Sequence, residues 1–225
     1  MESSTLYSLR KTSKVLCKTP LNDNLGETDI EDLLDAASWA PFHYAASAEH
    51  RSQLCDDAPE PWRIHVLTHE ACLQLRSWLI DSGDMSKIPD MLAGASLLLQ
   101  VTWCPNPPPA DVELPKETRF YPSDINLEHI AATAAAIQNM LLCATEKRIP
   151  TYWSSGGPLR KPDVFKLLEI PDSQILLGSV FLFPENIDKL SDDGDIQIIP
   201  GKMRDKRSTS KSWSRTIPHI LSKQT

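Results

Sequence analysis

The chain has 225 residues, of which 41% are hydrophobic and 24% are charged. This length favours one domain with a substantial core over two small ones. Lys and Arg number 23 against 30 Asp and Glu, and the resulting net charge of −7 argues against sequence-independent nucleic-acid binding. With 18 prolines and 8 glycines, the chain has little material for a glycine-rich nucleotide loop, and no Gly-x-Gly-x-x-Gly or Walker pattern occurs.

The 5 cysteines are scattered, with no Cys-x-x-Cys pair. This argues against a disulfide framework and a zinc site, so we expect a reducing compartment and no metal. No apolar run has the length of a signal peptide or a membrane span. We therefore expect a cytoplasmic protein without membrane or nucleic-acid partners. A mitochondrial presequence stays open, because several basic residues follow serines near the N-terminus.

The first half of the chain predicts two helices and two strands. Thr28 and Glu31 form a capping-box pattern, and apolar residues then recur at helical spacing up to Pro41. Residues 42–61 are polar and irregular. A strand is predicted over 63–67, a helix over 70–80 and a buried strand over 97–103. The proline-rich segment 104–122 predicts a long loop of the functional or disordered kind.

The second half is dominated by a helix predicted over 127–147, which is Ala-rich and apolar nearly all round. Such a helix is buried at the centre of a domain or at a dimer interface. A strand over 149–153, a turn, a helix over 161–168, a strand over 174–183 and a basic tail from Lys202 follow. The mixture predicts an α/β or α+β class. We expect a single domain over residues 1–225. The pattern is compatible with flexible ends at 1–8 and 216–225.

Positive charge gathers at the two ends of the chain. Chain termini often lie close in space, so the two clusters could meet on one phosphate group. The alternative is that both are solvated tails. The clusters are Arg10, Lys11, Lys14 and Lys18 at one end, and Lys202, Arg204, Lys206, Arg207, Lys211 and Arg215 at the other.

Six short motifs follow one another along the chain: LRKTSK at 9–14, AASWAP at 36–41, EPWRI at 60–64, AAIQNMLLCA at 135–144, WSSG at 153–156 and ILLGSV at 175–180. In order and spacing, from about residue 9 to 207, they resemble the motifs of nitroreductase-family flavoproteins. Residues 9–14 (LRKTSK) are similar to the family's Arg-Arg-Ser-x-Arg signature, and residues 36–41 (AASWAP) to its Ala-Ala-x-x-Ala-Pro. Residues 60–64 (EPWRI) resemble its Gln-Pro-Trp-x-Phe. Residues 135–144 (AAIQNMLLCA) resemble its central helix, 153–156 (WSSG) its Trp-x-x-Gly turn, and 175–180 (ILLGSV) its last core strand.

The resemblance implies an α+β nitroreductase-like fold, with a central mixed or antiparallel sheet flanked by helices in an intertwined homodimer. FMN would sit at the subunit interface. The resemblance implies that Arg10 and Lys14 hold the FMN phosphate, with Lys11 or Thr12 beside them. The tail would close over the same phosphate through Arg204 or Arg207. Ser154, Ser155 and Gly156 would present backbone to the flavin ring, and Pro41, Phe42 and His43 would border it from the partner subunit.

The sequence departs from the family where the family contacts the ring. An insert, residues 44–59, separates Pro41 from Pro61, so the segment 42–60 is expected near the flavin. Phe42 replaces the family's Ser, Ala58 falls at its Asn and Glu60 replaces its Gln. A carboxylate at Glu60 would lower the flavin reduction potential.

Among the aromatic and ionisable residues, His43 is the candidate proton donor to a reduced substrate, because histidine titrates near neutral pH. The alternative is a loop histidine bonded to backbone. Trp39 and Trp62 are expected in the core.

The function that the resemblance implies is an FMN-dependent oxidoreductase. It would take reducing equivalents from NAD(P)H through bound flavin to a nitro, quinone or similar organic acceptor. Two alternatives stay open: a non-catalytic or regulatory flavin-binding protein on the same scaffold, and an anion- or nucleic-acid-binding module that uses the basic tail.

Overall fold

A four-stranded antiparallel sheet forms the centre of the computed structural model, which describes residues 3–21, 23–52, 58–116, 118–190, 194–201 and 214. Its strands lie in the order β2 (Trp62–Thr68), β3 (Leu97–Trp103), β5 (Ile175–Leu182) and β4 (Thr151–Ser154). A separate two-stranded ribbon pairs β1 (Ser13–Cys17) with β6 (Ile196–Pro200). All pairs among the described strands are antiparallel. This confirms the α+β class and its antiparallel form rather than a mixed sheet.

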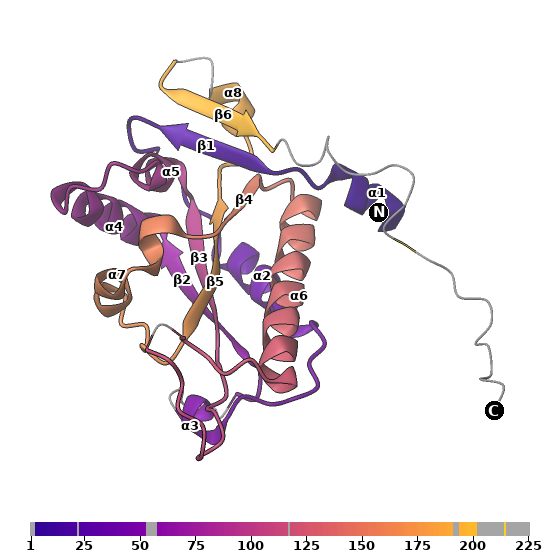
Figure 1. Cartoon of the computed structure of the whole chain (residues 1–225). Helices are drawn as coiled ribbons and strands as arrows, with labels where there is room; N and C mark the ends of the chain where they lie inside the picture. Colours follow the sequence, from indigo (N-terminus) through magenta and orange to yellow (C-terminus); the bar gives the residue numbers. More distant parts are fainter. Residues whose placement is uncertain are drawn as a thin grey trace.

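Helices cover both faces of the sheet because β3 is apolar on both (Figure 1). Leu97, Leu99 and Val101 pack in one core with α2 (Glu27–Ser38) and α6 (Asp124–Glu146). Leu98 points the other way, as strand alternation requires. It joins the core formed with α4 (His69–Asp81), α5 (Ile88–Gly94) and α7 (Pro162–Leu167).

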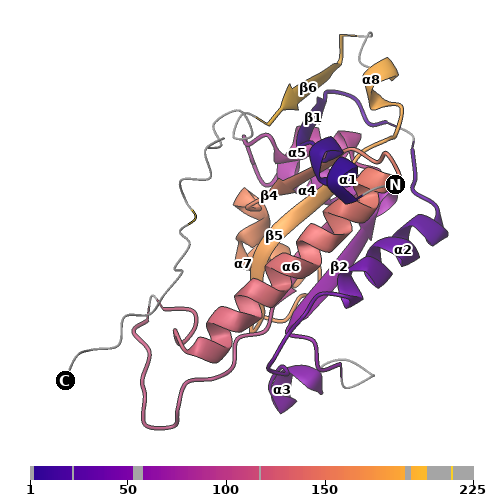
Figure 2. The ribbon, with the colours of Figure 1, turned by 90° about the vertical axis from the view of Figure 1, so that its right-hand side faces the viewer.

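The remaining elements are short. They are α1 (Ser3–Leu9), α3 (Ala48–Arg51), the 3₁₀ turn η1 (Gly157–Arg160) and α8 (Ile187–Leu190). In Figure 2, α1 lies beside the end of α6 that is nearer the β1–β6 ribbon. Pattern reasoning did not predict β1, β6, α1, α3, α5 or α8. The pairing of β1 with β6 joins residues that are far apart in the sequence, so no local pattern announces it.

The predicted elements match the structure, and the errors lie at their ends. The strand over 97–103 is confirmed. Helix α6 begins earlier than predicted, because Ser123 caps it by accepting a hydrogen bond from the Asn126 amide at 3.2 Å. The capping box at Thr28 was wrong: α2 begins at Glu27 after Gly26, with no side-chain cap bond.

One side of α6 is buried and the other is open in the single chain. Ala136, Ile137 and Met140 are at most 1% exposed, whereas Leu127 is 55% exposed. Trp62 is buried as expected, but the prediction for Trp39 was wrong, because its side chain is 78% exposed. Trp39 follows the last residue of α2, where the chain turns away from the core. No helix in the described part of the chain is both long and apolar enough to cross a membrane.

The insert and the proline-rich loop pack at the start of α6. The insert is closed at its neck by a hydrogen bond from the Ala46 amide to the Pro59 carbonyl at 2.9 Å. The buried Arg63 guanidinium donates to the Glu60 carbonyl at 2.6 Å and the Ala58 carbonyl at 3.2 Å. The ring of His129 links both segments to α6, with the Tyr44 and Cys104 carbonyls at 3.1 and 3.0 Å.

Candidate functional site

The first part of the candidate site is the start of β1, where the chain carries its N-terminal cations. Lys14 lies on this strand, and its Nζ stands 5.5 Å from the centre of the Tyr152 ring on β4. Burial lowers the pKa of Lys14, and the nearby charge of Lys87 lowers it further. Lys14 forms no ion pair with a carboxylate of the described residues. An ammonium that is partly desolvated and repelled by a second cation favours an anionic partner.

The basic tail leaves the described structure at the same place. The Gly201 amide donates to the Thr12 carbonyl at 3.0 Å, and a Cβ at Gly201 would lie 2.8 Å from the Thr12 Cβ. Arg204 and Arg207 lie outside the described residues, so their predicted role stays a prediction. The described chain ends beside Thr12 at Gly201, one residue before the basic tail, so whether the two cationic clusters meet stays a prediction.

The second part of the site is the turn that follows β4. Ser154 accepts a hydrogen bond from the Gly156 amide at 3.1 Å. Gly156 and Gly157 have φ angles of +99° and +53°, which only glycine adopts readily. A Cβ at Gly156 would lie 2.7 Å from Leu176, whereas one at Gly157 would meet nothing within 4 Å. The backbone at Gly157 therefore faces open space.

Arg160 holds this turn against β5, and sequence reasoning missed it. Its guanidinium donates to the carbonyls of Ser155, Leu176 and Leu177, the last two at 2.7 and 3.2 Å. Burial and the neighbouring Arg119 lower the pKa of Arg160. The only sequence signal was an arginine three residues after a Gly-Gly pair.

Buried polar side chains lie beneath the turn at one level of the sheet. Ser154 pairs in register with Ser179, Ser179 with Gln100, and Gln100 with His65. The Ser179 hydroxyl donates to the Gln100 side-chain oxygen at 2.5 Å, and both residues are fully buried. The Gln100 Nε2 is buried without a partner among the described residues. Sequence reasoning named Ser154 for its backbone but missed His65, Gln100 and Ser179, because they interrupt strands otherwise read as apolar.

The third group of predicted residues lies elsewhere. Phe42 packs edge-on against Trp62, with ring centres 5.6 Å apart. The exposed His43 side chain places its Nδ1 3.2 Å from a carboxylate oxygen of Glu128, near the start of α6. Pro41 is exposed and Glu60 is half-buried at the foot of the insert.

The segment that carries His43 and the strands β1 and β4 lie at opposite ends of α6 (Figure 2). His43 contacts Glu128 in the helix's second turn, whereas Lys14 contacts Tyr152, beyond its last residue, Glu146. At about 1.5 Å per residue, Glu128 and Glu146 are about 27 Å apart along the axis. The chain thus brings Lys14 against β4, two residues before Ser154, and leaves Pro41–His43 and Glu60 at the other end of α6.

Comparison with known proteins assigns this architecture to a family. The family model described as the nitroreductase family matches residues 21–182, well over half of the chain. The chain belongs to the nitroreductase family. The matched region includes the turn after β4 and the 41–60 segment, but neither the cations of β1 nor the basic tail. No curated protein sequence matches the chain.

Solved structures with the same fold are distant in sequence. The nitroreductase-like family protein from Bacillus cereus has a TM-score of 0.62 and 18% identity, and the similarity covers 97% of both chains. The nitroreductase CinD from Lactococcus lactis in complex with chloramphenicol has a TM-score of 0.55 and 17% identity, over 80% of this chain and 87% of that one. A nitroreductase candidate from Desulfovibrio desulfuricans in complex with FMN has a TM-score of 0.52 and 12% identity, over 81% and 85%. At these identities, the likeness establishes the nitroreductase fold.

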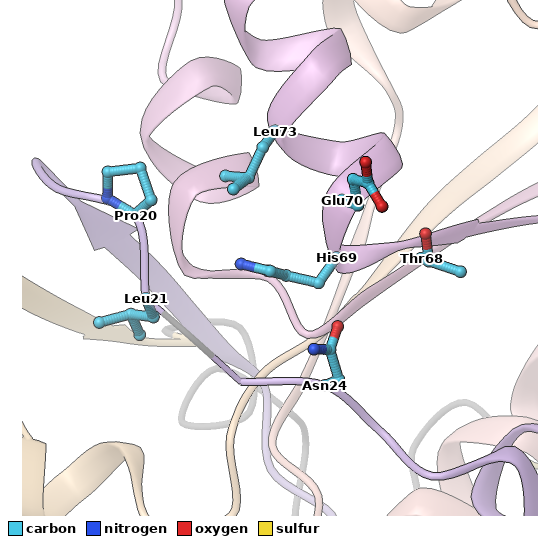
Figure 3. A pocket seen from close by; sticks show the side chains of 7 residues that line it. All are labelled: Pro20, Leu21, Asn24, Thr68, His69, Glu70 and Leu73. Carbon is cyan, nitrogen blue, oxygen red and sulfur yellow. The ribbon is translucent and has the colours of Figure 1, made fainter.

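A large cavity of the described structure lies away from all of these residues. About 620 Å³ in volume, it is bounded by the segment before α2 and the first turn of α4 (Figure 3). The His69 ring extends into it and is held by a hydrogen bond between its Nδ1 and the Ala95 carbonyl at 2.8 Å. No residue predicted for flavin binding in this nitroreductase-family chain lines the cavity.

Proposed function

We propose that this nitroreductase-family protein is an FMN-dependent oxidoreductase that takes reducing equivalents from NAD(P)H and passes them to a nitro, quinone or similar organic acceptor. The observation that carries the proposal is the contact between Lys14 on β1 and Tyr152 on β4, the strand that leads into the glycine turn. A phosphate-bearing planar cofactor needs both features: cations for the phosphate and open backbone for the ring.

The residues present fit the phosphate of FMN. Lys14 is partly desolvated and has no carboxylate partner among the described residues, so a dianion there would relieve its repulsion from Lys87. Lys11, three residues earlier in the chain, is exposed, and Arg10 is half-buried. In this proposal Arg10 and Lys14 hold the phosphate, and Lys11 or Thr12 reaches the phosphate or the ribityl chain.

The turn after β4 fits the ring. Open space at Gly157 leaves room for a planar group against the backbone, and the bonds of Ser154 and Arg160 fix the turn before any ligand arrives. Ser154, Ser155 and Gly156 then orient the ring through their backbone. When bound, FMN supplies the hydride-accepting and electron-donating chemistry that no side chain of this protein can perform.

A second copy of the chain would complete the site. The outer side of α6 exposes Leu127 and Ala131, with Leu142 half-buried further along the helix. Beside Leu142, the exposed Trp39 borders a hollow of about 480 Å³ between α2 and α6. Exposed apolar surface of this kind is typical of an interface between protein chains. We therefore propose a homodimer in which Pro41, Phe42, His43 and Glu60 of one chain approach the flavin held by the other.

His43 is the proposed proton donor to the reduced acceptor. The Glu128 carboxylate, 3.2 Å from its Nδ1, orients the ring and leaves Nε2 for the acceptor. The exposure of His43 in the single chain suits a group that works across a subunit interface. Substitution of His43 by Gln should lower kcat more for acceptors that take up a proton with the electrons than for acceptors that take up electrons alone.

The first test is the visible absorption spectrum of the purified protein, before and after heat releases any ligand. We expect a flavin spectrum with FMN in the supernatant, followed by NADH or NADPH oxidation when a quinone is added. A flavin-bound protein that fails to oxidise either nucleotide would instead be a non-catalytic flavin-binding protein. A colourless protein that does not take up added FMN would overturn the proposal.

A further inference from the structure

A cavity lined by two arginines lies behind the turn after β4. It has a volume of about 360 Å³, and Arg119, Arg160, Pro162, Phe165 and Asp172 line it. It lies at the start of α7, so it belongs to the sheet face covered by α4 and α7 rather than to the face covered by α6 (Figure 1). The sequence assigned neither arginine a role, and the proposed flavin site uses Arg160 only to fix the turn and does not use Arg119.

Arg160 links this cavity to the turn. A guanidinium carries five N–H donors. Three of them reach the carbonyls of Ser155, Leu176 and Leu177, so one N–H on each terminal nitrogen is left over. These bonds fix the position of the positive charge without neutralising it, because carbonyl groups carry no net charge.

Arg119 supplies a second positive charge to the same cavity. Its Nη2 donates to the Gln174 carbonyl at 3.5 Å, and the described structure shows no other hydrogen bond from its guanidinium. Burial lowers the pKa of Arg160, and the charge of Arg119 lowers it further. Asp172 also lines the cavity, but within the described part of the chain neither arginine approaches a carboxylate to ion-pair distance.

We propose that this cavity binds a phosphate group. Two arginines that repel each other and lack an ion-paired carboxylate are stabilised by a dianion between them, and guanidinium forks match phosphate oxygens. The balance of two positive charges to one at Asp172 favours a dianion over a neutral ligand. The cavity exceeds the size of phosphate alone, and Phe165 and Pro162 offer apolar surface to the organic part of a phosphate ester.

Occupation of the cavity would reach the flavin through Arg160, and this step rests on the proposed function. The guanidinium that would hold the phosphate also holds the Ser155 carbonyl, so a bound anion changes how strongly Arg160 donates to the turn. We expect the visible spectrum of bound FMN to shift when phosphate binds.

The binding step can be tested separately from the flavin. Isothermal titration calorimetry of the purified full-length protein with inorganic phosphate should show one site per chain. The titration is done at constant ionic strength and with excess FMN, so that the cofactor occupies its own proposed phosphate site at Lys14. Arg119→Gln should weaken this site about tenfold or more, because it removes a charge-assisted contact. Lys116→Gln removes a charge from the same loop without lining the cavity, and should bind phosphate as the wild type does.

Two further experiments identify where phosphate binds and which molecule carries it. Lys14→Gln should leave this affinity unchanged; a loss there with full binding in Arg119→Gln would move the phosphate to β1 and overturn the proposal. Absence of phosphate binding by the wild type would also overturn it. If the natural source is the 2′-phosphate of NADPH, Arg119→Gln raises KM for NADPH and not for NADH. If it is a separate phosphate ester, both KM values stay unchanged while phosphate affinity falls.

The outcomes also separate this inference from the proposed function. A protein that binds phosphate through Arg119 but never takes up FMN would retain the cavity's role and lose the flavin assignment. A flavoprotein with normal turnover and no Arg119-dependent phosphate binding would retain the proposed function and lose the cavity's role.

Discussion

The two regions expected to contact the flavin are built in different ways. The corner made by β1, β4 and the turn after β4 is held by contacts within one chain, with Lys14 against Tyr152 and Arg160 holding Ser155 to β5. The segment from Pro41 to Glu60 is held by its own contacts at the other end of α6, where Arg63 and His129 bind its carbonyls. A site held by contacts within one chain can bind the phosphate of a cofactor. The role of an exposed segment, by contrast, can change with the chain that packs against it.

Dissociating the proposed dimer should have the largest effect on FMN binding, because it removes the 41–60 segment of the other chain from every flavin site. Ala131→Glu places a carboxylate on the exposed side of α6, and we expect monomers and loss of FMN binding. Light scattering and the flavin content of the purified protein measure both. Gln74→Glu adds the same charge to the exposed side of α4 and should leave both unchanged. A flavin-loaded Ala131→Glu monomer would show that one chain suffices.

Removing the cation proposed to hold the FMN phosphate should have the next largest effect. Lys14→Gln deletes a charge-assisted contact with the phosphate, so the Kd for FMN should rise about tenfold to a hundredfold. Fluorescence titration of the flavin-free protein measures this. Lys18→Gln removes a charge just beyond the same strand, where Lys18 already pairs with Asp90 at 2.8 Å, and should leave FMN affinity near wild type. Equal losses of FMN affinity in both variants would indicate that the overall positive charge of this region, rather than a direct contact with Lys14, attracts the cofactor.

Distorting the turn tests the corner's rigidity. Gly156→Ala combines an unfavourable φ of +99° with a Cβ 2.7 Å from Leu176, so the free energy of unfolding should fall by more than about 2 kcal/mol. Gly83→Ala has a φ of +76° and open space around its Cβ, so its loss should stay at about 1–2 kcal/mol. Urea denaturation measures both. Equal losses would show that the clash with Leu176 relaxes without cost.

Glu60 tests the electrostatics of the second region. A carboxylate near the flavin disfavours negative charge on the reduced ring, so Glu60→Gln should raise the FMN reduction potential. Redox titration against a reference dye measures the change. An unchanged potential would mean that Glu60 does not face the flavin, even in the dimer.

The smallest effect concerns acid stability. Burial lowers the pKa of His65 below its ordinary value of 6.5; the charge of Arg63 adds to this, and the bond to Gln174 opposes it. The unfolded chain therefore binds the proton more readily, and stability is lost as the pH falls below about 6.5. His65→Gln should weaken this dependence. Parallel urea-midpoint curves for variant and wild type between pH 7.5 and 5 would contradict the expectation.

Much of the fold was predictable because its signals are local. The strand over 97–103 is a continuous apolar run, and α6 carries enough apolar residues to mark a helix of its length. Trp39 was placed wrongly because helical periodicity describes a face and not what covers it. The ribbon of β1 and β6 was missed because its two short strands come from opposite ends of the chain.

The sequence by itself indicated the family, most of the helices and strands of the core and the grouping of cations near the N-terminus, since each is written in contiguous motifs. Only the tertiary structure decided which of these residues meet. Lys14 reaches Tyr152, Arg160 holds Leu176 of β5, and Arg119 joins Arg160 at one cavity because segments distant in sequence pack on the same sheet. The same packing keeps His43 at the far end of a 23-residue helix, a separation that residue types alone do not record.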